Sequence, residues 1–222
     1  LAGLAFHTNV TSDDVYREGM TRVTADDIAA AKSLGYVIKL LAIAELTDDD
    51  KGVIVRVHPA MIPVTHPLAS VRDAFNAVFV EADAAGQVMF YGRGAGGAPT
   101  ASAILGDLVA VARHAAYSTV GYGESDYADL DIAPIGAVKS QFFVRLHVAD
   151  KSGVLASIAQ TFASENVSIQ TVRQAGLGED AELIVVTHAA SEDALDACVE
   201  KLKKMDIVSK VESVIRVEGA PA

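Results

Sequence analysis

Strand and helix patterns alternate through about the last 80 residues in an order that few folds accommodate. Apolar and polar side chains alternate from Phe142 to Val148, which is typical of a strand with one buried face. A helical stripe follows, with apolar residues at Leu155, Ile158 and Phe162. The remaining patterns are strands over 167–174, 182–188 and 208–217, and a helix that begins at 191. This βαββαβ order predicts a ferredoxin-like split βαβ unit.

The first 135 residues have adjacent strands rather than repeated βαβ units. Turn residues from 47 to 52 join two β-rich segments and predict an antiparallel hairpin. Strands are expected over 36–46, 53–62, 75–81 and 87–91, and helical segments over 1–6, 11–19, 24–35, 68–73 and 99–116. Residues 117–134 have no period, which is typical of a linker and predicts domains 1–135 and 136–222. The predicted class is α+β, with a mixed, largely antiparallel sheet and helices before the ferredoxin-like unit.

The composition excludes several kinds of partner. The net charge is −11, without a basic cluster, which argues against nucleic acid and anionic membrane surfaces. No apolar run reaches the roughly 18 residues of a membrane span. Cys198 is the only cysteine, which excludes an intrachain disulfide, suits a reducing cytoplasm and predicts inert core packing. The hydrophobic content of 51% predicts further burial between subunits or domains.

A glycine-rich loop follows the strand expected at 87–91. Residues 92–97 are Gly-Arg-Gly-Ala-Gly-Gly, and Pro99 and Thr100 then open the next helix. Free amides at such a helix start attract phosphate. The spacing matches neither G-x-G-x-x-G nor a P-loop, because no Gly-Lys-Ser/Thr follows. From the residues alone, a nucleotide-binding loop and a tight packing loop are equally supported.

Other polar residues have both a functional and a structural interpretation. His58 and His66 could form a metal pair, but each precedes a proline and no carboxylate lies at ligand spacing, which favours structural histidines. Lys39 lies among apolar residues and could act as an acid or base, but extension from a strand edge to solvent is favoured. The three aspartates at 48–50 favour a solvated turn over a calcium loop. No catalytic residue and no metal site is predicted.

The turn Asp150-Lys151-Ser152-Gly153 precedes the first helix of the C-terminal unit. Its amides could hold the carboxylate of a free amino acid. A plain capped helix accounts for the same residues, so both interpretations stay open.

Taken together, these segments resemble homoserine dehydrogenase, in the longer form that carries a C-terminal ACT domain. The resemblance runs in order along nearly the whole chain. The segments before the linker are 5–8, 14–19, 34–41, 56–59, 66–69, 75–80 and 89–103, and those of the ACT part are 150–155, 183–188 and 213–216.

The resemblance implies NAD(P)H-dependent reduction of L-aspartate 4-semialdehyde to L-homoserine, in threonine, methionine and isoleucine biosynthesis. It places the nucleotide-binding domain, the proton-donating lysine and the acidic homoserine-binding residues upstream of Leu1. The chain is therefore expected to be a fragment that lacks the start of the catalytic domain and is inactive alone. Gly94, Gly96 and Thr100 match positions near the nicotinamide end of NADP or NAD. Lys39 matches a different segment from the proton donor.

An ACT domain implies an amino-acid effector, and threonine is the implied one because it is a pathway end product. The matching effector-binding positions are Asp150, Ser152, Gly153, Val154 and Leu155. ACT domains pair between subunits, so a cytoplasmic homodimer or homotetramer is expected. The alternative is a non-enzymatic amino-acid-binding regulatory or oligomerisation module.

Overall fold

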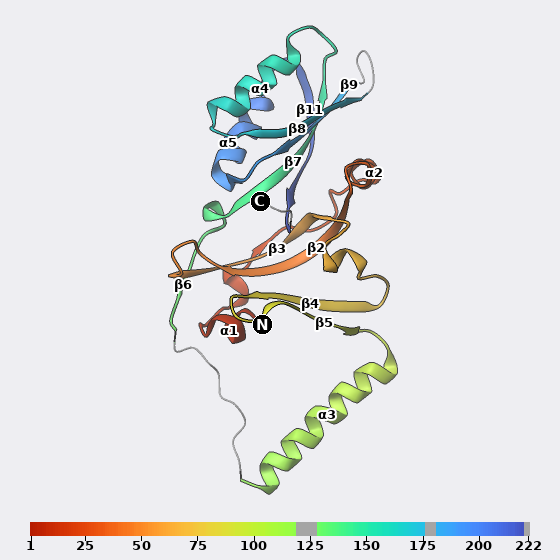
Figure 1. Cartoon of the computed structure of the whole chain (residues 1–222), viewed down its shortest axis with the longest axis vertical. Coiled ribbons are helices and arrows are strands. Elements are labelled where there is room, and N and C mark those ends of the chain that lie inside the picture. The colour runs from red at the N-terminus through yellow and green to blue at the C-terminus, as the bar shows by residue number, and fades with distance from the viewer. Residues whose placement is uncertain (119–127, 176–180, 220–222) are drawn as a thin grey trace. The chain divides into compact units, whose positions relative to one another are not determined.

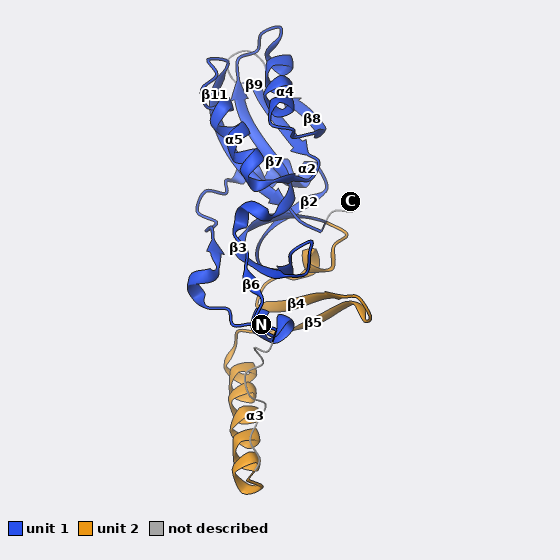
Figure 2. Cartoon of the chain, turned by 90° about the vertical axis from the view of Figure 1, so that its left-hand side faces the viewer, with its two compact units in different colours: residues 1–63, 126–222 blue, residues 64–125 orange. Residues whose placement is uncertain are grey.

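The computed structural model describes residues 1–118, 128–175 and 181–219 (Figure 1). The chain divides into two compact units, one made of residues 1–63 and 126–222 and the other of residues 64–125 (Figure 2). The larger unit therefore combines the N-terminal hairpin region with the C-terminal βαββαβ unit. The domain boundary expected near residue 135 remains a prediction.

The larger unit contains four α-helices and two short 3-10 helices among its described residues. The helices are α1 (Ala2–Phe6), η1 (Ser12–Asp14), α2 (Ala25–Ser33), η3 (Ile135–Ala137), α4 (Val154–Ser164) and α5 (Glu192–Leu202). The strands before residue 135 are β1 (Tyr16–Arg17), β2 (Tyr36–Leu46), β3 (Gly52–Pro63) and β6 (Asp131–Ile132). The later strands are β7 (Lys139–Val148), β8 (Ile169–Ala175), β9 (Ala181–Thr187), β10 (Ala190–Ser191) and β11 (Val208–Val217).

One sheet joins all of these strands. Its main path runs β1-β3-β11-β7-β9-β8, while β2 and β6 pair with β3, and β10 pairs with β7. The predicted hairpin is confirmed, since β2 and β3 pair antiparallel from Tyr36 opposite Pro63 to Leu46 opposite Val53. The last strand, β11, lies antiparallel to β7 and also pairs in parallel with β3, with Arg216 opposite Ala60. The N-terminal hairpin and the C-terminal unit are thus parts of a single sheet.

The C-terminal part of this sheet is covered on both faces. On one face, α4 and α5 pack side chains such as Phe162 and Leu195 against β7 and β9. On the other face, α2 places Ala31 against Phe143. Figure 1 shows α4 and α5 on one side of the strands and α2 on the other. The expectation that β7 has one buried face is therefore wrong, because α2 comes from outside the βαββαβ unit to bury the second face.

Helix α2 is set by strong local signals. The Thr24 hydroxyl accepts a hydrogen bond from the Asp27 amide at 3.2 Å, and the Asp27 carboxylate accepts one from the Thr24 amide at 2.8 Å. This capping box satisfies two amides at the helix start. Gly35 follows the helix with φ +83°, a backbone conformation that suits glycine.

Cys198 lies on the inner face of α5 and is fully buried in the core. Burial raises the pKa of its thiol to about 12, so the side chain stays a neutral, inert packing group. The predicted structural role of Cys198 is confirmed.

The smaller unit contains η2 (Pro67–Ser70), β4 (Phe75–Ala82), β5 (Gly86–Arg93) and α3 (Gly97–Ala116). The two strands form an antiparallel hairpin, in which the rings of Phe75 and Tyr91 stack with centroids 4.8 Å apart. None of the 20 residues of α3 is buried, and the exposed ones include Ile104 and Leu108.

The helix expected over 11–19 is wrong. Only the three residues of η1 are helical, and Tyr16 and Arg17 then pair in parallel with Arg56 and Val57 of β3. Pairing with a distant strand outweighs the local helix signals here. The expected linker at 117–134 contains the short strand β6, and its residues 119–127 lie outside the described residues. Within the described part of the chain, no helix combines the length and hydrophobicity needed to cross a membrane.

Candidate functional site

The glycine-rich loop connects β5 to α3. A Cβ at Gly94 would lie 1.7 Å from the Asn76 side-chain nitrogen, so a side chain at this position would have to displace the exposed Asn76 side chain of β4. Gly96 has φ +132° and is the N-cap of α3. The local structure of the chain thus favours glycine at both positions, which agrees with the interpretation of this segment as a tight packing loop.

The start of α3 also presents a surface on which a ligand could bind. Gly96 provides no side-chain cap, and the Thr100 amide donates to the Gly96 carbonyl at 3.1 Å. Pro99 is the third residue of the helix, where a missing amide hydrogen costs no intrahelical bond. The amides of this open first turn fit an acceptor group of a nucleotide cofactor. That role for Gly94, Gly96 and Thr100 stays a prediction.

A cavity of about 100 Å³ lies at the start of α4. Four of the five predicted effector positions line it, namely Asp150, Gly153, Val154 and Leu155, while Ser152 lies in the adjoining turn. Gly153 is the N-cap of α4 with φ +90°, and no atom lies within 4 Å of where its Cβ would be. The structure therefore gathers these positions around an open helix start.

The histidines and aspartates of the sequence analysis have structural partners. His58 is fully buried, with Nδ1 3.0 Å from the Pro59 carbonyl oxygen and Nε2 3.2 Å from Arg56 Nε. His66 lies in the other unit, where its Nδ1 accepts a hydrogen bond from the Leu68 amide at 3.2 Å and caps η2. The carboxylate of Asp48 pairs with Lys139 at 2.8 Å in an exposed turn. Lys39 is half-buried on β2.

Three arginines that were not predicted as functional residues, Arg56, Arg145 and Arg216, are buried on β3, β7 and β11. Each stands between two apolar residues in its strand, as in Val144-Arg145-Leu146. A cation in such a position needs a buried carboxylate partner, so this pattern is the signal that could have revealed the three residues.

Each arginine joins segments that are far apart in the sequence. Arg216 donates to Glu18 at 2.9 Å, to Tyr16 Oη at 3.2 Å and to Glu192. Arg145 bonds Asp27 at 2.8 Å, Glu182 at 2.7 Å and Thr24 at 3.1 Å. Arg56 bonds Glu45 at 2.6 Å and Glu218 at 3.2 Å. Arg145 and Arg216 thus bind the C-terminal unit to the segment from β1 to α2.

Burial and hydrogen bonding act against each other on these carboxylates. Burial raises the pKa of Asp27, but hydrogen bonds from Ser213, Thr24 and Arg145 outweigh it and hold the pKa below its ordinary value. For Glu192, burial is the larger effect and raises the pKa despite the bonds from Arg216. Asp27 is therefore charged at neutral pH and relies on Arg145 and its other donors.

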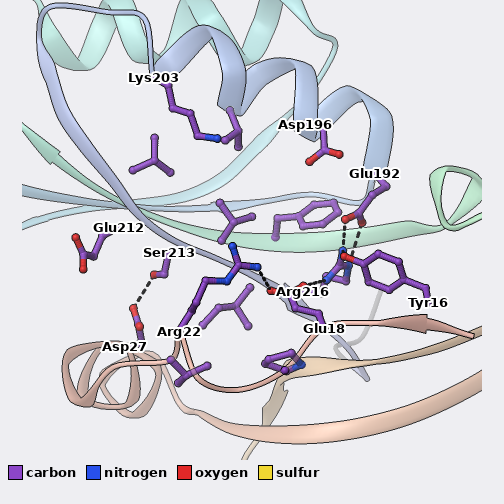
Figure 3. A pocket seen from close by; sticks show the side chains of 18 residues that line it. Tyr16, Glu18, Arg22, Asp27, Glu192, Asp196, Lys203, Glu212, Ser213 and Arg216 are labelled. Carbon is purple, nitrogen blue, oxygen red and sulfur yellow. Dashed lines mark hydrogen bonds and ion pairs between the residues drawn. The ribbon is translucent and has the colours of Figure 1, made fainter.

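A second, larger cavity of about 270 Å³ lies where α5 and β11 face the segment 16–27 (Figure 3). Arg216 and its partners Tyr16, Glu18 and Glu192, here called the Arg216 cluster, form part of the wall of this cavity. Figure 3 shows Asp196 on α5, Lys203 at the C-terminal end of that helix, and Arg22 on the opposite side of the cavity. No residue of this cavity was predicted as a site residue from the sequence.

Comparison with known families accounts for most of the chain. Residues 1–109 match the homoserine dehydrogenase family, and residues 142–206 match the ACT domain family. The chain is 52% identical to homoserine dehydrogenase of Mycobacterium tuberculosis H37Rv, across 99% of the chain and 52% of that relative. It is 51% identical to homoserine dehydrogenase of Corynebacterium glutamicum, across 98% of the chain and 50% of that relative.

Solved structures agree with this assignment. The crystal structure of a homoserine dehydrogenase from Thiobacillus denitrificans superposes with a TM-score of 0.90 at 35% identity, covering 98% of this chain and 50% of that one. The chain thus spans about half the length of the curated relatives it matches. On this evidence the chain belongs to the homoserine dehydrogenase family, in a form that carries an ACT domain.

Proposed function

We propose that this chain supplies the distal part of a homoserine dehydrogenase that reduces L-aspartate 4-semialdehyde to L-homoserine with NADPH or NADH in the cytoplasm. The observation that carries the proposal is the identity of about half of all positions to named homoserine dehydrogenases over 99% of the chain. Residues 1–135 would belong to the catalytic and dimerisation domain, and residues 136–222 to a regulatory ACT domain.

In this proposal, the chain contributes one wall of the cofactor site. The bound nicotinamide would supply the hydride. The first-turn amides of α3 would bind an acceptor group of the cofactor, and Gly94 and Gly96 would let it approach the backbone. Thr100, exposed in the same turn, would offer a hydroxyl. In this proposal, groups from outside residues 1–222 would position the cofactor against the substrate.

The chain alone is therefore expected to show no dehydrogenase activity. Fusion behind the upstream half of the Corynebacterium glutamicum relative should yield an active enzyme, because the cofactor and the reacting groups are then brought together. The measurement is NADPH oxidation with L-aspartate 4-semialdehyde. In the active fusion, Gly96→Val should lower kcat/KM at least about tenfold, since a side chain would block the cofactor wall. Gly86→Val is the control, because Gly86 also has a positive φ, +66°, and nothing lies within 4 Å of its Cβ position, so the variant imposes a similar backbone strain away from the cofactor wall. Reduction of L-aspartate 4-semialdehyde by the chain alone would contradict the proposal. An unchanged kcat/KM in the Gly96→Val fusion would also contradict it.

We also propose that the cavity at the start of α4 binds an amino-acid effector, with threonine as the first candidate. Its carboxylate would meet the amides of the turn at Ser152 and Gly153, and its side chain would pack near Val154 and Leu155. Asp150 would face its ammonium group. The support is the ACT family match together with the cavity that four of these residues line.

Saturating L-threonine is expected to raise the melting temperature of the chain by several degrees. Gly153→Asp should abolish that shift, because it places a carboxylate where the effector carboxylate binds. Gly35→Asp is a matched control, since Gly35 also has a positive φ, +83° against +90°, with no atom within 4 Å of its Cβ position. Differential scanning fluorimetry with threonine, methionine, isoleucine and lysine makes the test. The absence of any shift would count against the effector site.

The alternative function is a non-enzymatic module for amino-acid binding or oligomerisation. The exposed apolar side chains of β5 and α3, including Phe90 and Leu108, support burial against another surface. Analytical ultracentrifugation should give a homodimer or homotetramer. The purely structural role would be favoured if the chain forms an oligomer, binds none of the four amino acids and gives an inactive fusion.

A further inference from the structure

We propose that the cavity of about 270 Å³ between α5, β11 and the segment 16–27 is a second small-molecule site, and that its ligand is a free α-amino acid with a branched aliphatic side chain. The proposal depends neither on the dehydrogenase reaction nor on the effector cavity at α4. The volume of the cavity approaches the roughly 300 Å³ at which small-molecule pockets begin.

Three charged side chains that line this cavity form no strong ion pair within the protein, so they are available to a ligand. Asp196 has no hydrogen-bond or ion-pair partner among the described residues. Lys203, the residue that directly follows the last turn of α5, pairs with Glu200 at 2.7 Å, but both side chains are more than half exposed. Arg22 is 82% exposed and pairs with Glu18 at 2.9 Å. The Lys203–Glu200 pair is exposed on both sides and contributes little, so a ligand can compete for Lys203. Glu18 is only 19% exposed, but the exposed guanidinium of Arg22 has further N–H donors that a ligand carboxylate can use.

The inner wall is different, because its charges are already satisfied. Arg216 is held by Glu18, Glu192 and Tyr16, and these groups have no need of a ligand. Apolar side chains from both elements also line the cavity, including Val199 of α5 and Val211 and Val214 of β11. These apolar side chains would favour the burial of a short hydrocarbon side chain.

The mixture of charges selects the class of ligand. An anion would bind Lys203 and Arg22 but face Asp196 and the other carboxylates of the lining, which outnumber its cations. A simple cation would be attracted by Asp196 but repelled by Lys203 and Arg22. A zwitterion can place its ammonium group at Asp196 and its carboxylate at the two cations, and an aliphatic side chain can then cover the valines.

Such a ligand would contact both α5 and the segment 16–27. Binding there would favour the arrangement in which the C-terminal unit docks on the N-terminal segment, because only that arrangement forms the complete cavity.

L-Valine binding to the full chain, measured by isothermal titration calorimetry, tests the site. Isobutylamine, which lacks the carboxylate, and 3-methylbutanoate, which lacks the ammonium group, should each bind at least about tenfold more weakly. Lys203→Gln and Asp196→Asn should each weaken L-valine binding at least about fivefold. Lys204→Gln and Asp206→Asn, which change neighbouring exposed charges outside the cavity, should leave the affinity within about twofold.

Three results would overturn the proposal: no saturable binding of L-valine, equal binding of either analogue, or an affinity that Lys203→Gln and Asp196→Asn both leave unchanged. Gly153→Asp separates this site from the proposed effector site. Loss of L-valine binding in that variant, with retention in the two α5 variants, would assign the ligand to the α4 cavity and reject this one.

Discussion

Replacement of Arg145 with methionine is expected to lower the free energy of unfolding of the chain by about 3–5 kcal/mol. Arg145 is 2% exposed, and its partner Asp27 is fully buried. The variant leaves the Asp27 carboxylate charged in the interior without its cation, and the desolvation cost of that charge is no longer offset. Urea unfolding followed by circular dichroism gives the measurement.

Two further variants separate this effect from the loss of any ion pair. Lys139→Met removes the exposed pair with Asp48, whose side chains are 64% and 88% exposed, and should cost at most about 1 kcal/mol. The double variant Arg145→Met/Asp27→Asn removes the unpaired charge and keeps an acceptor for the Thr24 amide, so it should be more stable than Arg145→Met alone. A loss below about 1 kcal/mol in Arg145→Met would show that the pair does not hold the two segments together.

Stability is expected to fall by about 3 kcal/mol through His58 alone as the pH drops from 6.5 to 4. Burial lowers the pKa of His58 from its ordinary value of 6.5 to about 4, although the hydrogen bond to the Pro59 carbonyl acts in the opposite direction. The unfolded chain therefore takes up a proton on this imidazole at a pH where the folded chain does not. The contribution is complete above pH 6.5 and is lost as the pH falls toward 4.

The test compares the wild-type chain with His58→Gln over this pH range. The comparison is needed because burial raises the pKa values of Glu192 and Glu218, whose contributions are present at low pH and are lost as the pH rises. Subtraction of the variant curve isolates the imidazole. His114→Gln, on exposed α3, controls for the substitution itself. Parallel curves for wild type and His58→Gln would contradict the expectation.

Local signals in the sequence were sufficient for most individual elements. The β2–β3 hairpin, α2 with its Thr24 cap, and the βαββαβ order all follow from periodicity, turn residues and capping residues. These features depend on residues within a few positions of one another. The helix expected at 11–19 failed because Tyr16 and Arg17 pair with a strand that lies about 40 residues later.

The two cavities also differ in whether their residues are close together or far apart in the sequence. Most residues that line the cavity at the start of α4 lie between 148 and 155, so the turn at 150–153 could be singled out from the sequence, while Gln174 and Leu183 reach the cavity only through the fold. The Arg216 cluster and the larger cavity beside it could not be predicted in this way. The atoms of Arg216 and Glu18 that meet at 2.9 Å belong to residues 198 positions apart, and Arg145 and Asp27 are 118 positions apart.

The sequence by itself therefore determined most of the individual helices and strands, the ferredoxin-like order of the C-terminal unit and the resemblance to homoserine dehydrogenase. Only the tertiary structure decided that β11 pairs with β3, that α2 covers the second face of β7, and that three arginines are buried between the segments. The physical reason is that hydrophobic periodicity records which side of an element is buried but not which distant element buries it. A buried charge is stable only where a partner from elsewhere in the chain meets it, and the fold alone brings the two together.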